Sequence, residues 1–353
     1  MVYDALGGGE GESLSRLKEQ WAGVWHGRAT QWSAATGSCI TADSARFEYV
    51  VSNARVEQND SGDDALTRVS GEITTGAGEQ SRHAFTLRYN CEDVFVFSDG
   101  GSFSSEHWMF EGYPYGPRGA SAGFLTTMAI EHCVSLSATE RFRCFVCYDA
   151  AKCLERIVLC EEVRDACWEN RDPLSIVSLL GTWQGQARMK RSKVAGSGFM
   201  NFDLISTFGW DGEAAVRRSQ KMQARLSDAL ISEKSASDAQ QKRPKVPATV
   251  DEILRLNNVS QGAAKQEEPT ITTTYGEYDG NNRIILGSAP HTHVMYLLSH
   301  GAYVVSPASL DLNVPWNSEF ALHLSEDNRK RVVRLYTKDN VPASDVLSVE
   351  SRL

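Results

Sequence analysis

Two stretches of this chain repeat one another without a gap, and this internal repeat constrains the fold more than any other feature. Residues 131–148 and residues 319–336 both follow the pattern E-x4-L-S-x3-R-x-R-x4-Y. An earlier Gly-x-Trp-x-Gly segment at residues 23–27 recurs at residues 181–185. Self-similarity of this kind is typical of a chain that folds the same unit more than once. The chain has 353 residues, which is long enough for two units, and we expect one in each half.

The second copy is longer than the first, and composition locates the excess. Trp183 follows Trp25 by 158 positions, whereas Arg329 follows Arg141 by 188, so the second copy gains 30 residues. Residues 211–274 contain no aromatic side chain and are rich in Ser, Ala, Gln, Lys and Glu. Such a stretch cannot bury enough apolar surface to offset the entropy of ordering the chain. The expected organisation is a flexible leader at 1–13, a first domain at 14–170, and a second domain at 171–353 with a disordered low-complexity insertion at about 211–269.

Between these landmarks the sequence is typical of short β-strands. Aromatic and β-branched residues gather in short runs, and glycine-containing turn signals separate the runs. The runs are 82–89, 94–97, 156–160, 283–286, 294–298 and 332–336. Many short strands joined by turns predict a sandwich or a barrel, and two copies predict two of them.

One pairing of residue types makes this prediction more specific. A Gly-x-Trp on the first strand, together with an Arg on the last, resembles the lipocalin or calycin superfamily, in which the arginine lies across the tryptophan at the closed end of the barrel. The resemblance implies an all-β fold: two tandem lipocalin-like antiparallel β-barrels, with a short helix leading into each. The residues that it implies for barrel closure are Trp25 with Arg141 or Arg143, and Trp183 with Arg329 or Arg331.

The second half of the chain resembles one family more closely. Residues 293–307 read HVMYLLSHGAYVVSP, and residues 326–336 read EDNRKRVVRLY. Both segments look like a two-barrel family of cyanobacteria and chloroplasts that was long classed as a domain of unknown function. This resemblance covers most of the chain outside the leader and the insertion.

The resemblance also implies a function. Chloroplast members of the family resemble, in role, a biogenesis factor for the chloroplast ATP synthase, a stromal chaperone that contacts the γ and β subunits of the catalytic head. We therefore expect a non-catalytic assembly factor in the chloroplast stroma, or in the cytoplasm if the source is cyanobacterial. The neighbouring phycobilin lyases make a bilin-binding protein or lyase the first alternative. A carrier of lipid or of another small hydrophobic ligand is the second, because a barrel of about eight strands can hold one small ligand.

Charge and motif content argue against several other functions. The formal net charge is −9, whereas nucleic-acid binders concentrate positive charge to neutralise phosphates. No stretch approaches the roughly 20 apolar residues that span a bilayer, so membrane insertion is not expected. The phosphate-loop, dinucleotide and nucleophile-elbow motifs do not occur in the sequence. The sequence thus predicts no catalytic residue, no cofactor and no metal.

Two patterns have the spacing of a metal half-site, and both have a simpler interpretation. Cys144-x-x-Cys147 could belong to a zinc site. The surrounding residues predict a strand, however, and residues three apart on a strand point to opposite faces. We therefore interpret these cysteines as small buried hydrophobic side chains. His291 and His293 share one strand face, but no third ligand is identifiable, which favours a pair at the start of a strand.

The best candidate for a protein interface is the loop at residues 111–119. It carries Tyr113, Tyr115 and Arg118, and two prolines stiffen it. Exposed tyrosine and arginine are enriched at protein interfaces. An ordinary long connection between strands is the alternative interpretation.

Aromatic side chains in the first half could either line a ligand cavity or fill the barrel. Filling is the more frequent outcome for residues of this bulk, and we prefer it. The residues concerned are Phe85, Tyr89, Phe95 and Phe97.

Overall fold

The computed structural model describes fourteen segments of the chain, which together contain one helix and seventeen strands. The segments are residues 10–40, 47–58, 66–75, 81–90, 94–99, 101–108, 128–164, 179–192, 195, 198–209, 270–278, 282–286, 292–310 and 313–353. Most of the predicted leader lies outside these segments. The helix expected before the second barrel and the insertion at 211–269 also lie outside them. No helix within them is long and apolar enough to cross a membrane.

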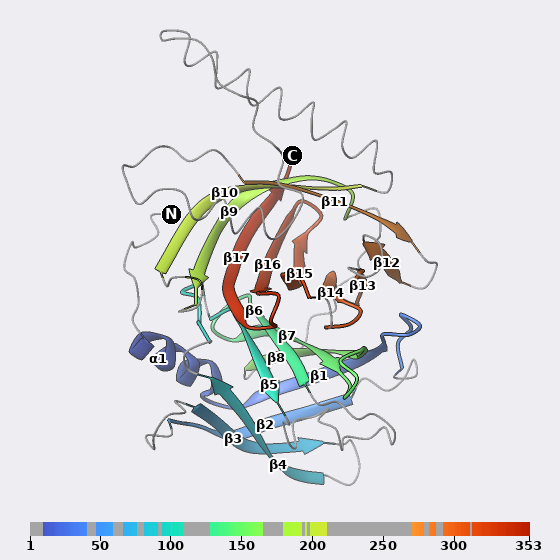
Figure 1. Ribbon diagram of the computed structural model, residues 1–353. Helices are drawn as coiled ribbons and strands as arrows, with labels where there is room; N and C mark the ends of the chain where they lie inside the picture. The colour runs from blue at the N-terminus through green and yellow to red at the C-terminus, as the bar shows by residue number, and fades with distance from the viewer. Residues whose placement is uncertain are drawn as a thin grey trace, which may run out of the picture.

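The first half of the chain forms a helix and an eight-stranded antiparallel sheet (Figure 1). Its elements are α1 (Glu10–Trp21), β1 (Trp25–Ser33), β2 (Phe47–Gln58), β3 (Leu66–Thr75), β4 (Ser81–Asn90), β5 (Phe103–Trp108), β6 (Met128–Ser135), β7 (Glu140–Tyr148) and β8 (Leu154–Arg164). The strand order is β4-β3-β2-β1-β8-β7-β6-β5. The sheet curls, but its two outer strands, β4 and β5, share no ladder. Among the described strands one of the eight seams is left unpaired, so the prediction of a closed first barrel is wrong.

The second half forms a closed barrel. Its strands are β9 (Gly181–Arg191), β10 (Gly198–Gly209), β11 (Thr270–Tyr278), β12 (Arg283–Leu286), β13 (His293–Leu297), β14 (Ala302–Pro307), β15 (Trp316–Ser325), β16 (Asn328–Tyr336) and β17 (Pro342–Arg352). All neighbours pair antiparallel except β10 and β11, which run parallel. The prediction of a wholly antiparallel barrel is wrong at this one seam. Parallel neighbours need a long crossover connection, and here residues 210–269 separate the two strands.

The all-β prediction is confirmed, and five of the six strand runs fall in strands. The run at 94–97 is different, because its residues form no strand. Its side chains still alternate between two cores. Val94 and Val96 pack inside the curled first sheet, whereas Phe95 and Phe97 pack between the two halves of the molecule. The side chains of this run therefore alternate between two faces as they would in a strand, although its backbone joins no strand ladder.

The sequence repeat is also a structural repeat. The turns that join β7 to β8 and β16 to β17 each hold one residue in the left-handed region, Lys152 at φ 61° and Asn340 at φ 60°. These two residues are 188 positions apart, as are Arg141 and Arg329. The same backbone turn therefore recurs at the same place in both copies.

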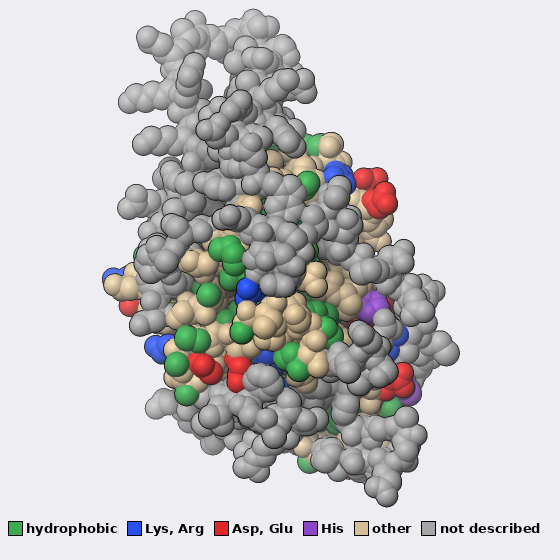
Figure 2. Space-filling view, turned by 90° about the vertical axis from the view of Figure 1, so that its right-hand side faces the viewer, with side chains coloured by type: hydrophobic (Ala, Val, Ile, Leu, Met, Phe, Trp, Pro, Cys, Tyr) green, Lys and Arg blue, Asp and Glu red, His purple; other side chains and the backbone are tan. Residues whose placement is uncertain are grey.

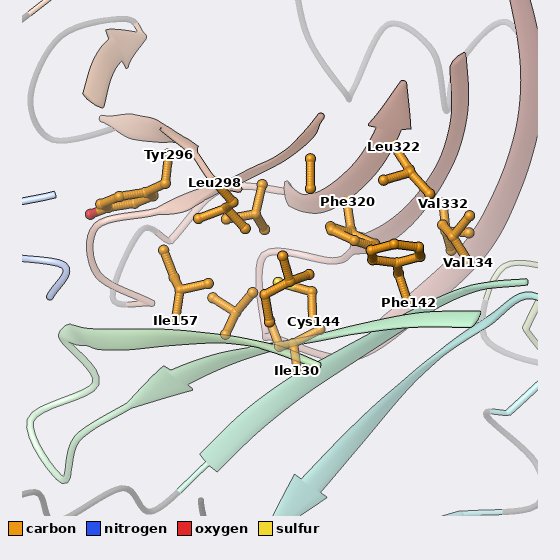
Figure 3. Packing of buried hydrophobic residues seen from close by; sticks show 14 of the residues in the cluster. Ile130, Val134, Phe142, Cys144, Ile157, Tyr296, Leu298, Phe320, Leu322 and Val332 are labelled. Atoms are coloured by element: carbon orange, nitrogen blue, oxygen red, sulfur yellow. The ribbon is translucent and has the colours of Figure 1, made fainter. Parts of the chain in front are cut away.

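The two halves share one hydrophobic core. Figure 3 shows side chains of the first sheet, including Ile130, Phe142 and Cys144, facing Phe320 and Val332 of the barrel. Alternation along each strand sends one set of side chains inward and the other into this shared core. The two sheets therefore bury their outer faces against each other, and the predicted boundary between the domains, at 170/171, lies outside the described segments.

Polar contacts also cross this shared core. Lys330 Nζ lies 2.5 Å from Asp99 Oδ2, and His300 Nε2 lies 2.8 Å from Glu161 Oε1. Arg334 Nη1 donates a hydrogen bond of 3.0 Å to the carbonyl oxygen of Ser104 on β5. Charge-assisted bonds of this kind fix how the two sheets sit on each other, in addition to the apolar burial.

Candidate functional site

The tryptophan–arginine pairs named from the sequence come together in both halves. In the first half, Arg141 Cζ lies 3.9 Å from the centroid of the Trp25 ring. Arg143 instead lies over Trp21 of α1, at 4.4 Å. In the barrel, Arg329 Cζ lies 4.4 Å from the Trp183 ring. These distances are within the range of cation–π attraction.

Glutamates that the sequence reasoning missed complete the cluster in the first half. Arg141 Nε donates to Glu162 Oε2 at 2.5 Å, and Arg143 Nε donates to Glu131 Oε1 at 2.5 Å. Tyr49 donates its hydroxyl to Glu162 at 2.7 Å. All five side chains are buried, so each charge has its partner in a site that excludes water.

The barrel repeats this arrangement with matching residues. Arg329 Nη2 and Arg331 Nε each lie 2.6 Å from a carboxylate oxygen of Glu350. Arg331 also pairs with Glu319 at 3.1 Å, and Glu319 accepts a hydrogen bond from Tyr303 at 2.9 Å. Each network therefore contains two arginines and two glutamates, and its formal charges cancel.

The sequence held a signal for these glutamates. Glu131 and Glu319, and likewise Glu162 and Glu350, are separated by the same 188 positions as the paired arginines. Continued past Tyr148 and Tyr336 without a gap, the repeat reaches Glu162 and Glu350 and ends at an arginine in each copy. Those last arginines also lie over the two tryptophans, Arg164 at 4.4 Å from Trp25 and Arg352 at 5.7 Å from Trp183.

These networks are built for structure rather than for proton transfer. Burial alone would raise the pKa of Glu350, but attraction to Arg331 and Arg329 outweighs it and lowers the pKa to about 2. Burial would also lower the pKa of Arg331, but attraction to Glu319 and Glu350 raises it instead. A carboxylate and a guanidinium held in their charged forms exchange no proton near neutral pH. What they provide is a fixed ion pair, which is costly to break.

A second polar cluster lies between the two halves and centres on His132. Its Nδ1 lies 2.8 Å from Ser104 Oγ, and its Nε2 lies 2.8 Å from Ser318 Oγ. Ser306 donates to Ser318 at 3.1 Å, and Tyr148 Oη lies 2.8 Å from Ser306 Oγ. Burial, and next to it the charge of Arg334, lower the pKa of His132 to about 3, so this imidazole is neutral near pH 7. The cluster is sealed from solvent and joins the two halves.

The two cysteines of the first metal-like pattern lie on opposite faces of their strand, as the strand interpretation predicts. Cys144 packs in the core between the halves, and Cys147 packs inside the first sheet, on the other face of β7. Burial raises the pKa of Cys144. His293 is the first residue of β13, and His291 lies outside the described segments. Within those segments, no group of three or more His, Cys, Asp or Glu residues could hold a metal.

The other candidate residues named from the sequence lie either in a hydrophobic core or outside the described part of the chain. Phe85 fills the interior of the first sheet, while Phe95 and Phe97 pack between the halves. The side chain of Tyr89 lies outside the described part, and so does the candidate interface loop with Tyr113, Tyr115 and Arg118.

Comparison with known proteins identifies the fold. No protein-family model matches the sequence. No curated protein matches it either. A solved structure does match, that of a protein of unknown function of the DUF3598 family from the cyanobacterium Nostoc punctiforme. It is 16% identical, the match covers 97% of this chain and 99% of that one, and the TM-score is 0.57. Over nearly its whole length, the chain is therefore structurally similar to a cyanobacterial protein of the DUF3598 family.

Proposed function

We propose that this chain is a non-catalytic assembly factor that binds another protein along the open edge of its first sheet. The observation that carries the proposal is the unpaired seam between β4 and β5. The barrel has no such seam, because its nine strands form a closed ring. An edge strand presents a row of backbone donors and acceptors, and many proteins bind an extended segment by adding it to such an edge.

The two sides of the seam are not equally available. β5 lies against the barrel, and the carbonyl oxygen of Ser104 on this strand already accepts a bond from Arg334. β4 pairs with β3 over all ten of its residues. No strand of the described segments pairs along its other side. Within the described segments, β4 is therefore the edge strand with unpaired backbone, and part of it comes close to β5.

The described side chains in view form no large apolar patch. In Figure 2, the described hydrophobic side chains form small separate groups among charged and polar ones. Large apolar patches mark protein interfaces, but several small groups of this kind are ordinary protein surface. Backbone pairing along β4 would give affinity without such a patch.

The residues of β4 favour a partner segment of opposite charge. Phe85 and Leu87 pack inside the sheet, so alternation along the strand assigns positions 82 and 88, both arginine in the sequence, to the other face. A second copy of β4, in the antiparallel register centred on Phe85, would place Arg82 opposite Arg88. Like charges directly opposite one another are destabilising. An acidic extended segment of a different protein fits this edge better.

Capture of purified subunits tests the proposal. The family resemblance names the γ and β subunits of the ATP synthase as partners, and the full-length tagged chain would serve as bait. We expect retention that weakens as salt is raised, because exposed charges are screened. Loss of retention in the double variant Arg82→Glu/Arg88→Glu would support the proposal that the subunits bind along β4. The matched control is Arg55→Glu, which makes the same charge reversal at an exposed position of β2, two strands in from the edge and opposite Ser70.

Two results would count against the proposal. Retention of the subunits that is equal in the edge variant and in the control would show that β4 is not the docking site. No retention of either subunit, together with visible absorbance when bilin is added, would favour the tetrapyrrole-handling alternative over the assembly factor.

A further inference from the structure

The two halves pack on each other through matched faces of the repeat, and the strand registers establish the match. His132 on β6 pairs with Cys144 on β7, and 188 positions later Phe320 on β15 pairs with Val332 on β16. Cys144, Phe320 and Val332 all pack in the shared core. Each half therefore uses the same face to meet the other, as the two subunits of a twofold-symmetric dimer do.

In a twofold contact, every interaction has a second copy in which the two units exchange roles. Tyr148 Oη lies 2.8 Å from Ser306 Oγ of the barrel. The counterpart of Tyr148 is Tyr336, which meets Glu106 of the first half: burial, and next to it the charge of this carboxylate, raise the pKa of Tyr336. Ser306 and Glu106 also match, because β14 and β5 pair with corresponding positions of β15 and β6. The tyrosine contact therefore recurs with the roles reversed.

The turns before β5 and β14 provide a second reciprocal pair of contacts. Asp99 in the first turn pairs with Lys330 of the barrel, with Oδ2 2.5 Å from Nζ. His300 in the second turn reaches back to the first sheet, where its Nε2 lies 2.8 Å from Glu161 Oε1. The two turns meet matched sites, since the residue that each contacts belongs to a ladder pair and the two pairs are 188 positions apart: Phe142 with Glu161, and Lys330 with Val349.

The charges at these two sites suit only the pairing of unlike halves, a first sheet with a barrel. Two first sheets in the same geometry would bring Asp99 against Glu161 at both ends of the contact. Two barrels would bring His300 against Lys330, where neither side chain is an acid. Arg28 pairs with Glu161 of its own sheet at 2.7 Å in every arrangement, so it does not distinguish between them. Like charges brought together in a buried contact are unfavourable.

The middle of the contact contains a third difference between the halves. His132 Nε2 lies 2.8 Å from Ser318 Oγ. Their counterparts in the other half are Phe320 and Ile130, which are both apolar and belong to the shared core. Two first sheets would therefore place each His132 against Ile130, and Nε2 would be buried without a partner. A buried polar atom that loses its partner keeps the full cost of its desolvation.

We propose that this face recognises the unlike half of the chain, and that the three polar contacts exclude the same face of a second copy. The apolar side chains of the shared core supply the burial, but matched faces bury a similar area in any pairing. The polar contacts are what differ between the pairings, so they decide which half is accepted. This face is separate from the β4 edge, and its choice of partner does not depend on what binds there.

Exchanging two residues between the repeats tests this choice. In Asp99→His/His300→Asp, each turn receives the residue of the other turn, and the composition of the chain is unchanged. Within one chain, the new aspartate would lie against Glu161 and the new histidine against Lys330. Two copies that pair like halves would relieve both contacts. In size-exclusion chromatography with light scattering over a concentration series, we expect the unmodified chain to remain a monomer and the exchange variant to self-associate at least about tenfold more tightly.

Cross-linking identifies the faces that meet. A carbodiimide couples a carboxylate to an amine that it contacts, without adding a spacer. In the unmodified chain it should join Asp99 to Lys330 of the same molecule. In the exchange variant it should join position 300 of one copy to Lys330 of another. Mass spectrometry of a mixture of unlabelled and isotope-labelled chains distinguishes the two cases.

Two further variants separate recognition from a simple loss of stability. His26→Asp/Asp339→His makes the same exchange at exposed positions of the two halves and should remain a monomer. Adding Glu161→Gln/Lys330→Glu to the exchange variant removes the like charges between unlike halves at both sites. This compensated variant should return to the monomer, which a merely unstable chain would not do.

Three results would overturn the inference. The first is an exchange variant that stays monomeric over the whole concentration series. The second is self-association of the compensated variant, or of the exposed-position control, to the same degree as the exchange variant. The third is an assembly of the exchange variant in which no cross-link joins Lys330 to position 300 of a second copy.

Discussion

Lowering the pH from 7 to 5 should destabilise the folded chain through His132. The unfolded imidazole has its ordinary pKa of 6.5, whereas burial and the charge of Arg334 lower the folded value to about 3, despite the opposing effect of Glu131. Between these two values the unfolded state binds a proton that the folded state does not. Stability is therefore lost as the pH falls below 6.5. Each pH unit in this window costs about 1.4 kcal/mol, so the loss at pH 5 is about 2 kcal/mol.

Urea unfolding at pH 7 and at pH 5, followed by tryptophan fluorescence, measures this loss. Other groups titrate in the same range, including His323, whose pKa burial and then Arg329 lower to about 4. The comparison is therefore made against His132→Gln, whose amide can accept from Ser318 and donate to Ser104. The unmodified chain should lose about 2 kcal/mol more than the variant, because all other contributions cancel. Equal losses would refute the reasoning, since they would mean that His132 is not kept neutral between the halves.

Three further outcomes follow from the same contacts. Glu162→Gln and Glu350→Gln should each cost about 3–5 kcal/mol in urea unfolding, because each leaves a buried arginine unpaired, and a cost under about 1 kcal/mol would contradict the paired networks. Replacing residues 211–269 with a flexible linker of about 12 residues should leave the Tm nearly unchanged, because the parallel pair β10–β11 needs a crossover but not that composition, and a large drop in calorimetry would show that the segment is packed. Residues 1–170 expressed alone should aggregate in size-exclusion chromatography with light scattering, because they expose the face that packs on the barrel, and a stable monomer would show that the shared core is dispensable.

The repeat made part of this structure predictable. Trp25, Trp183 and the arginines lie in segments that recur without a gap, so their matched positions in two similar units could be named from the sequence. Glu131 and Glu319 open the repeat, but the tryptophan–arginine resemblance assigns them no role. Glu162 and Glu350 continue the repeat beyond Tyr148 and Tyr336, the last residues of the matched pattern.

Other features depend on pairings that no local pattern records. Whether β4 pairs with β5 depends on two strand ends brought together by the curl of the whole sheet. The parallel seam between β10 and β11 is a similar case, because Leu204 and Thr270 become neighbours across sixty-odd residues of intervening chain. The contact of His132 with Ser318 joins residues 186 positions apart in different halves. Alternation along a strand predicts which face a side chain occupies, but not which other sheet that face meets.

The two copies differ in how their sheets close. Among the described residues, the first sheet leaves one seam open, and its interior is filled by α1, Tyr49 and Phe145. The barrel closes every seam with one more strand. The open edge and the closed ring therefore occur in different halves that share one core. The edge proposed for docking thus belongs to the first half alone, because the ring of the second half offers no unpaired strand.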